Sequence, residues 1–185
     1  TEGTRIVEER LWHSDKKIDE DYKEEIFGKS LSPFDYKGTG SFVRYGPHLA
    51  GYIEPKFFNQ KRLLVREITN PKIIACLVDE EFVNDPQIIS IIPTSSARRL
   101  EPLWAILNSK LATFFHFNAS PKATKGAFPK ILVKDIREFP LPDWVNIEGL
   151  TEVVEKTLRA HKEGAREEVA ALLDRIDDLV FDAYG

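Results

Sequence analysis

Residues 103–142 constrain this 185-residue chain more than any other stretch, because they join an apolar helix, a basic loop and a short apolar run. The first part, LWAILNSKLATFFHF, carries apolar residues at spacings of three and four and predicts a helix with one buried face. Residues 118–130 contain a serine, a glycine and two prolines, which predicts a loop. Residues 131–139 predict a short strand that ends at the following Pro-Leu-Pro.

The loop and its flanks are basic within an acidic protein. Residues 110–137 contain six Lys and Arg residues against the single acid Asp135, a net charge of +5, whereas the whole chain has a formal net charge of −4. Residues 1–26 carry 5 basic and 9 acidic residues, residues 27–146 carry 16 and 11, and residues 147–185 carry 5 and 10. This asymmetry carries information about partners. A basic loop between two apolar elements predicts an anionic partner.

The same patterns divide the chain into an N-terminal helical segment (residues 1–26), a central domain (residues 27–146) and a C-terminal helical segment (residues 147–185). Apolar residues 18, 22 and 26 have the spacing of an amphipathic helix. In the central domain, residues 61–69, 72–78 and 87–93 predict strands separated by turns at Asn70-Pro71 and Asn84-Asp85-Pro86.

Near the C-terminus, apolar residues again recur at three and four, and Gly164 splits this pattern into two helices. The hairpin spacings of the central strands indicate a mostly antiparallel sheet. The expected fold class is therefore α+β: a small, mostly antiparallel sheet with a packed helix, flanked by an N-terminal helix and a C-terminal helix pair.

Cysteine usage and hydropathy bear on the compartment. The single cysteine, Cys76, lies in an apolar run, which predicts a buried core residue and suits the reducing cytoplasm. No apolar run approaches the ~18 residues that a membrane span requires. The chain begins at Thr1 and contains no methionine, from which we expect a piece of a longer protein.

Catalytic and metal-binding patterns are sparse. None of the four histidines stands at a metal-ligand spacing from a second His or Cys, and no nucleophile motif stands out, so no catalytic residue or metal ligand is assigned. One enzyme pattern stays open, the acid followed by acid-x-Lys with which restriction-type nucleases hold Mg²⁺ and activate water. Asp35 with Glu54 and Lys56 has this outline, although Pro55 breaks the strand that the site needs.

The basic middle of the chain suits nucleic acid better than catalysis. Lys and Arg, together with hydroxyls and backbone donors on loops, are the groups that contact phosphates, and Arg can bind guanine through two hydrogen bonds in the major groove. The alternative is a solvated loop whose charges serve solubility. On charge and placement alone, the residues predicted to bind DNA are Arg44, Arg62, Arg66, Lys122, Thr124 and Lys125.

Several of these stretches resemble the TaqI-like C-terminal specificity domain of fused restriction-modification enzymes and DNA adenine methyltransferases. RLLVREIT with KIIACLVDEEFVNDPQIISII is similar to a strand pair and turn of that family. LWAILNSKLATFFHF resembles its Asn-Ser-Lys-Leu helix, and KGAFPKILVKDIREFPLP resembles its Phe-Pro-Lys-Ile and Pro-rich ending. The tail DRIDDLVFDAYG is similar to the close of such chains, so the resemblance covers roughly residues 38–185.

The resemblance implies a target-recognition domain that binds double-stranded DNA and reads a short site through the major groove. The domain itself would not be catalytic. It would position an adenine for flipping into an upstream methyltransferase domain of the parent chain, a type II restriction enzyme or DNA methyltransferase. S-adenosylmethionine is the implied cofactor of that parent enzyme, and Mg²⁺ stays open as a second. Asn108, Ser109 and Lys110 match the family helix, and a structural role is favoured for them over base reading.

A protein-interaction module stays open as another class of function. In that alternative the C-terminal helix pair docks a partner chain, and polar changes at Leu172 and Ile176 abolish the association. The resemblance and the charge pattern favour DNA recognition.

Overall fold

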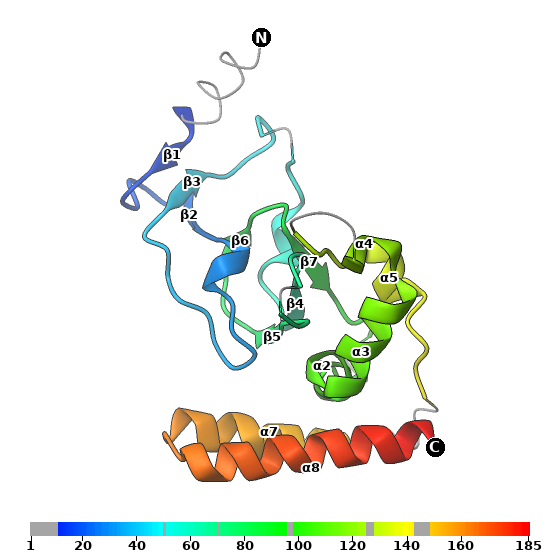
Figure 1. Cartoon of the computed structure of the whole chain (residues 1–185). Coiled ribbons are helices and arrows are strands. Elements are labelled where there is room, and N and C mark those ends of the chain that lie inside the picture. The colour runs from blue at the N-terminus through cyan, green and yellow to red at the C-terminus, as the bar shows by residue number, and fades with distance from the viewer. Residues whose placement is uncertain (1–10, 50, 70, 96–97, 125–127, 143–148) are drawn as a thin grey trace.

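Two small sheets and a group of helices form an α+β fold, as the sequence predicts (Figure 1). The computed structural model describes residues 11–49, 51–69, 71–95, 98–124, 128–142 and 149–185. The strands are β1 (His13–Ser14), β2 (Tyr22–Ile26), β3 (Phe42–Arg44), β4 (Arg62–Arg66), β5 (Ala75–Val78), β6 (Val83–Asn84) and β7 (Ile88–Ile91). The helices are η1 (Gly28–Ser30), η2 (Pro55–Phe57), α2 (Glu101–Asn108), α3 (Lys110–Ala119), α4 (Pro121–Thr124), α5 (Val133–Arg137), α7 (Leu150–Lys162) and α8 (Arg166–Tyr184). Over these ranges, no helix combines the length and the apolar character needed to cross a bilayer.

Strand β4 is the centre of the fold. It lies between β5 and β7 in a sheet that is antiparallel throughout. Its side chains alternate, so that Leu63 and Val65 face the helices while Leu64 faces the opposite side with Ile26 and Phe82. Leu63, Leu64 and Val65 are all fully buried, because both faces of the sheet are covered. This confirms the buried strand expected within residues 61–69.

The N-terminal helix predicted over residues 1–26 is wrong for residues 13–26, where the structure has β1, β2 and a non-helical turn region between them. The first sheet has the order β1–β3–β2–β6, and β2 pairs in parallel with β6. Ile26 pairs with Asn84 and is fully buried. The spacing of Ile18, Tyr22 and Ile26 fits a helix, but β2 pairs with strands far away in the sequence, which local periodicity does not report. Residues 1–10 lie outside the described part of the chain.

The helix predicted from residue 103 is interrupted at a buried serine. Ser109 Oγ donates to the carbonyl of Ile106 at 2.7 Å and accepts the N–H of Ala112 at 3.0 Å. The same hydroxyl therefore ends α2 and caps the start of α3.

The strand predicted over residues 131–139 is also wrong, because α5 occupies most of this run. The Asp135 carboxylate accepts the N–H of Leu132 at 2.8 Å, which satisfies a free donor at the start of the helix. An acid three residues into an apolar run is a helix-start signal, and here it outweighs the apolar character of the segment.

The C-terminal helix pair packs against the same core as β4. Gly164, with φ of 75°, makes the turn between α7 and α8, as the sequence predicts. The two helices run side by side beneath α2 (Figure 1). Val154, Ile176 and Val180 are buried in the cluster that contains Leu63. The alternative in which Leu172 and Ile176 dock a partner chain is therefore contradicted at Ile176, whose side chain packs inside the domain, while Leu172 is partly exposed.

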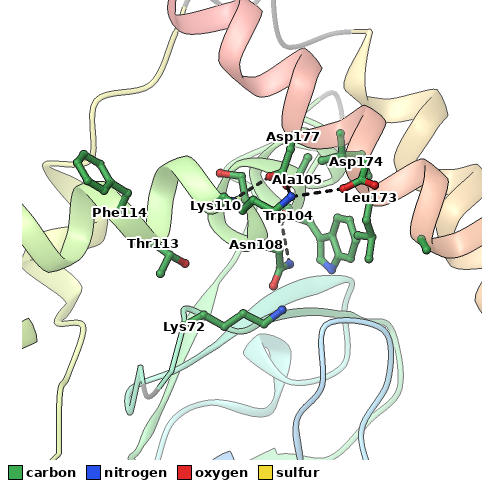
Figure 2. A pocket seen from close by; sticks show the side chains of 13 residues that line it. Lys72, Trp104, Ala105, Asn108, Lys110, Thr113, Phe114, Leu173, Asp174 and Asp177 are labelled. Carbon is green, nitrogen blue, oxygen red and sulfur yellow. Dashed lines mark hydrogen bonds and ion pairs between the residues drawn. The ribbon is translucent and has the colours of Figure 1, made fainter.

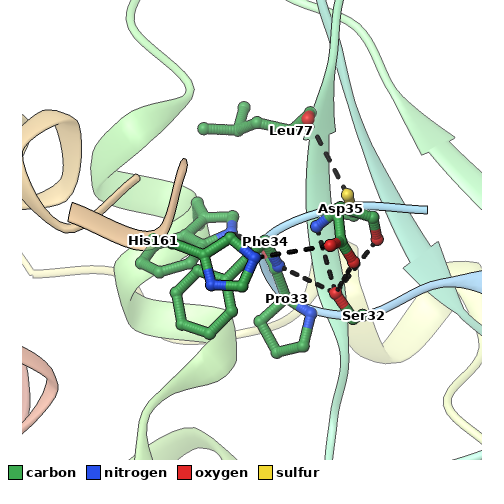
Figure 3. A network of polar contacts seen from close by, with 8 residues as sticks. Ser32, Pro33, Phe34, Asp35, Leu77 and His161 are labelled. Carbon is green, nitrogen blue, oxygen red and sulfur yellow. Dashed lines mark hydrogen bonds and ion pairs between the residues drawn. The ribbon is translucent and has the colours of Figure 1, made fainter. Parts of the chain in front are cut away.

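An aromatic contact and polar contacts also connect the helix pair to the rest of the domain (Figure 3). The His161 ring, near the end of α7, stacks on Phe34 with centroids 4.5 Å apart, and its Nε2 lies 3.3 Å from Asp35 Oδ2. A hydrogen bond from Ser32 to the Asp35 carboxylate is the main cause that lowers the pKa of Asp35. Through these contacts, residues 32–35 connect α7 to the part of the domain that contains the sheets.

Asn108 has the structural role expected for the Asn-Ser-Lys motif. Its Oδ1 accepts the N–H of Ala75 at 3.0 Å, and its Nδ2 donates to the carbonyls of Ala75 at 2.9 Å and Trp104 at 3.0 Å. Because β5 is an edge strand, the amide takes the place of a neighbouring strand. Asn108→Ala should lower the free energy of unfolding by about 2 kcal/mol in urea denaturation. Asn118→Ala, an exposed position on α3, should stay within about 0.5 kcal/mol; equal losses would contradict this role.

Candidate nucleic-acid interface

A cavity of about 570 Å³ opens where β4 ends. It collects side chains from the segment around η1, from the end of β4, from the turn before β7 and from the loop after α4. We call it the Phe27–Phe128 cavity. Its lining residues are Phe27, Gly28, Lys29, Arg66, Ile68, Asp85, Gln87 and Phe128.

Backbone pairing brings these segments together. The N–H of Glu67 donates to the carbonyl of Gln87 at 2.9 Å, and the N–H of Thr69 donates to the carbonyl of Pro129 at 2.9 Å. The chain beyond β4 therefore pairs first with the turn before β7 and then with residues 129–131. Gln87 and Phe128 come to the same end of β4 as a result.

Arg66 packs beneath Gly28. A Cβ added at Gly28 would lie 3.2 Å from Cγ of Arg66, so the missing side chain lets η1 rest on the arginine stem. The Nε of Arg66 donates to the carbonyl of Ile68 at 2.7 Å. Partial burial lowers the pKa of Arg66, yet an arginine keeps its charge at neutral pH. The cavity therefore has a cation whose side chain is held in place.

Two aromatic rings, a lysine and an acid complete the cavity. Phe128 is 66% exposed, whereas Phe27 is half-buried with Lys29 Nζ 6.0 Å from its ring centroid. Asp85 accepts the N–H of Gln87 at 2.9 Å, and burial raises the pKa of its carboxyl. Cations, an amide and flat apolar rings are the groups with which proteins bind phosphates and bases.

Three of the predicted DNA-binding residues lie in or beside this region. Arg66 lines the cavity. Lys122 is exposed on α4, and its carbonyl accepts the N–H of Lys130 at 3.2 Å, which ties α4 to the segment that follows Phe128. Thr124 ends α4. Lys125 lies outside the described residues.

The prediction for Arg62 is wrong, because its side chain is fully buried. The guanidinium lies 4.6 Å from the ring centroid of Phe82, and this burial lowers the pKa of Arg62. It cannot reach DNA. Its terminal nitrogens donate to the carbonyls of Phe58, Gln60, Glu80 and Phe82.

Arg44 lies elsewhere, on β3 of the first sheet. Its guanidinium is 3.4 Å from the carboxylate of Asp21, and both side chains are largely exposed. Arg44 does not line the Phe27–Phe128 cavity. The structure therefore does not bring Arg44 and Arg66 into one site.

The sequence reasoning missed most of the cavity. Two features of the sequence could have indicated parts of the cavity, namely the glycine after Phe27 and the turn at residues 84–86, because each marks the end of a strand. Those strand ends converge on Arg66 only through pairing between distant segments. Periodicity within one segment does not report such pairing.

A second cavity, of about 530 Å³, lies between α2, α3 and α8 (Figure 2). Lys110 reaches across it, with Nζ 2.8 Å from Asp177 Oδ2 and 3.4 Å from Asp174 Oδ1. These ion pairs raise the pKa of Lys110. Since the acids of α8 repel phosphate and the lysine is already paired, this cavity is poorly suited to nucleic acid.

The nuclease alternative gains no support from the positions of its acids. The Asp35 carboxylate contacts Ser32 and His161, whereas Glu54 pairs with Lys56. None of these contacts joins the two acids. Among the residues that the structure describes, no three His, Cys, Asp or Glu side chains form a group that could hold a metal ion.

Sequence comparison gives one family for the chain. The family described as "TaqI-like C-terminal specificity domain" matches residues 23–141. All residues that line the Phe27–Phe128 cavity fall within this range, whereas the second cavity includes residues of α8, beyond it. No curated protein matches the chain.

Proposed function

The chain belongs to the TaqI-like C-terminal specificity domain family, and on this premise we propose that it recognises a short sequence in duplex DNA through the surface around the Phe27–Phe128 cavity. The family supports a role in target recognition for restriction-modification. One observation supports this location of the DNA-binding surface. The cavity that combines cations, an amide and aromatic rings is lined only by residues within the matched range.

The side chains around the cavity divide into two roles in this proposal. Lys29 and Lys122 are exposed and contact phosphates, which gives affinity without sequence information. Arg66 and Gln87 contact base edges, because Arg pairs with the N7 and O6 of guanine and Gln with the N7 and N6 of adenine. The helices α7 and α8, of which α8 is acidic, lie outside the matched range and contribute no residue to the cavity.

Catalysis belongs to another part of the parent protein in this proposal. A methyltransferase domain of the same chain would hold S-adenosylmethionine and receive the flipped adenine. The parent would be a type II restriction enzyme or DNA methyltransferase of the cytoplasm, with Mg²⁺ supporting any cleavage. The specificity domain would supply orientation on the DNA.

Selection from a randomised duplex pool at low salt tests the proposal. We expect enrichment of a short motif. Arg66→Lys keeps the charge but loses the two-pronged geometry, so it should cost roughly 1–3 kcal/mol on the selected site and little on other sequences. Arg44→Lys, away from the cavity, is the matched control. Absence of binding at every salt concentration would refute DNA recognition, and equal losses on all sequences would remove Arg66 from base reading.

Lys122→Gln should reduce the salt dependence of DNA binding. If Lys122 neutralises one phosphate, the slope of log affinity against log salt should fall by about one unit. The loss of affinity should be similar on specific and non-specific duplexes. Lys156→Gln on α7, whose lysine pairs with Glu168 at 3.2 Å, should leave the slope unchanged. A slope that stays the same in Lys122→Gln would exclude this phosphate contact.

DNA binding should become stronger at lower pH, because the carboxylate of Asp85 loses its negative charge there. Burial raises its carboxyl pKa above the ordinary 3.8, so its negative charge is lost as the pH falls through that raised value. Loss of the charge removes repulsion against the DNA phosphates. Asp85→Asn, which keeps the oxygen that accepts from Gln87, should bind DNA severalfold more tightly at pH 7.5 and weaken the pH dependence. Asp182→Asn on α8 should behave as the unaltered protein; a pH dependence unchanged in Asp85→Asn would contradict this assignment.

A further inference from the structure

The shape of the Phe27–Phe128 cavity raises a question about how it contacts DNA. Reading base edges in an intact duplex requires side chains that project into a groove. A concave site of about 570 Å³ lies instead in the range of about 300–1,000 Å³ that is typical of pockets for small molecules. A single base that leaves the stack is the part of DNA that can enter such a pocket.

Phe128 has the position of a wedge at the rim. Its ring is 66% exposed although it is large and apolar. The chain beside it is held by the hydrogen bonds from Thr69 to Pro129 and from Lys130 to Lys122. Proteins that unstack DNA insert apolar side chains of this kind between neighbouring bases. An exposed phenylalanine that precedes a hydrogen-bonded segment and lies beside cationic groups fits that role.

The rest of the lining suits a flat heterocycle. Phe27 is half-buried within η1's segment and offers a second ring on which a base can stack. Arg66 and Gln87 are the two side chains that pair with the N7 edge of purines, guanine and adenine respectively. Stacking rings and purine-edge donors therefore line one cavity.

We propose that the Phe27–Phe128 cavity holds one unstacked purine of the bound DNA, with Phe128 as the wedge that separates it from its neighbour. This inference rests on the proposed function, because it concerns the same surface. It adds a base-holding step within the specificity domain itself, on Phe27 and Phe128.

Two duplexes of the same sequence test the inference, one fully paired and one with a bulged adenine replaced by 2-aminopurine. Unstacking a paired base costs a few kcal/mol, which a bulged base does not require. The complete chain should therefore bind the bulged duplex more tightly, by at least about tenfold. Stacking in the cavity should also quench the 2-aminopurine fluorescence.

Substitutions at the rings give the decisive readout. Phe128→Ala should abolish both the preference for the bulged duplex and the quenching. Phe181→Ala, 49% exposed on α8 outside the matched range, is the control and should keep both. Circular dichroism checks that each variant is folded.

Each outcome separates the inference from the proposed function. Equal affinity of the unaltered protein for both duplexes would overturn the base-holding role and leave DNA recognition intact. A preference that survives in both Phe27→Ala and Phe128→Ala would also overturn it. A bulged thymine bound as tightly as the bulged adenine would overturn the choice of a purine. Absence of binding to either duplex at any salt would refute the proposed function and this inference with it.

Discussion

Arg62→Met is expected to lower the free energy of unfolding by about 3–5 kcal/mol. The guanidinium is fully buried and donates hydrogen bonds to the carbonyls of Phe58, Gln60, Glu80 and Phe82, at distances from 2.6 to 3.2 Å. A methionine fills similar volume but leaves these oxygens without their donor. Urea denaturation followed by circular dichroism measures the change.

Two further variants isolate the cause. Arg62→Lys keeps the charge and loses the planar fork, so it should recover only part of the lost stability. Arg44→Met removes an exposed ion pair with Asp21 and should cost less than about 1 kcal/mol. If Arg62→Met and Arg44→Met unfold at the same urea concentration, the carbonyl network around Arg62 does not stabilise the fold.

Arg62 and Arg66 illustrate where sequence patterns stop being informative. Both lie on the face of β4 that carries Leu64, because side chains four residues apart on a strand point the same way. The residues around 58–60 and 80–82 close over Arg62, whereas Gly28 leaves space at Arg66. Charge and alternation are the same for both residues. Only the loops that cover them distinguish a core arginine from one that lines a cavity.

The fold was predictable where local patterns and packing agree. The strands around Leu64 and the helices on either side of Gly164 have periods that match their burial, and the structure confirms them. The predictions failed for β2 and α5. Strand β2 exists because it pairs with β3 and β6, and α5 exists because Asp135 caps its start. The pairing of β2 is non-local and the cap of α5 is a polar contact, and a hydrophobic period reports neither.

The predicted boundary near residue 146 does not coincide with a boundary in the packing. The family match ends at residue 141, yet the core that contains Leu63 and Trp104 also contains Leu150, Val154 and Val180. The Trp104 indole N–H donates to the carbonyl of Pro33 at 2.7 Å and is surrounded by this shared core. We therefore expect the helix pair and the matched residues to unfold together.

Val180→Asp tests this cooperativity and should have the largest effect on stability. The Val180 side chain is fully buried, so an aspartate there would place an unpaired charge in an apolar core and lower the free energy of unfolding by about 4 kcal/mol or more. Ala171→Asp makes a similar change at an exposed position of the same helix and should cost at most about 1 kcal/mol. Circular dichroism measures the stability of both variants.

Hydrogen exchange of the Trp104 indole N–H shows whether the loss of structure caused by Val180→Asp extends beyond the helix pair. If the helix pair and the matched residues form one cooperative unit, Val180→Asp should expose this N–H to exchange together with the amides of α8, while Ala171→Asp should leave its protection intact. Protection that persists at Trp104 while α8 exchanges would mean that residues up to 142 fold by themselves. In that case the helix pair would be a separable appendage of the matched residues.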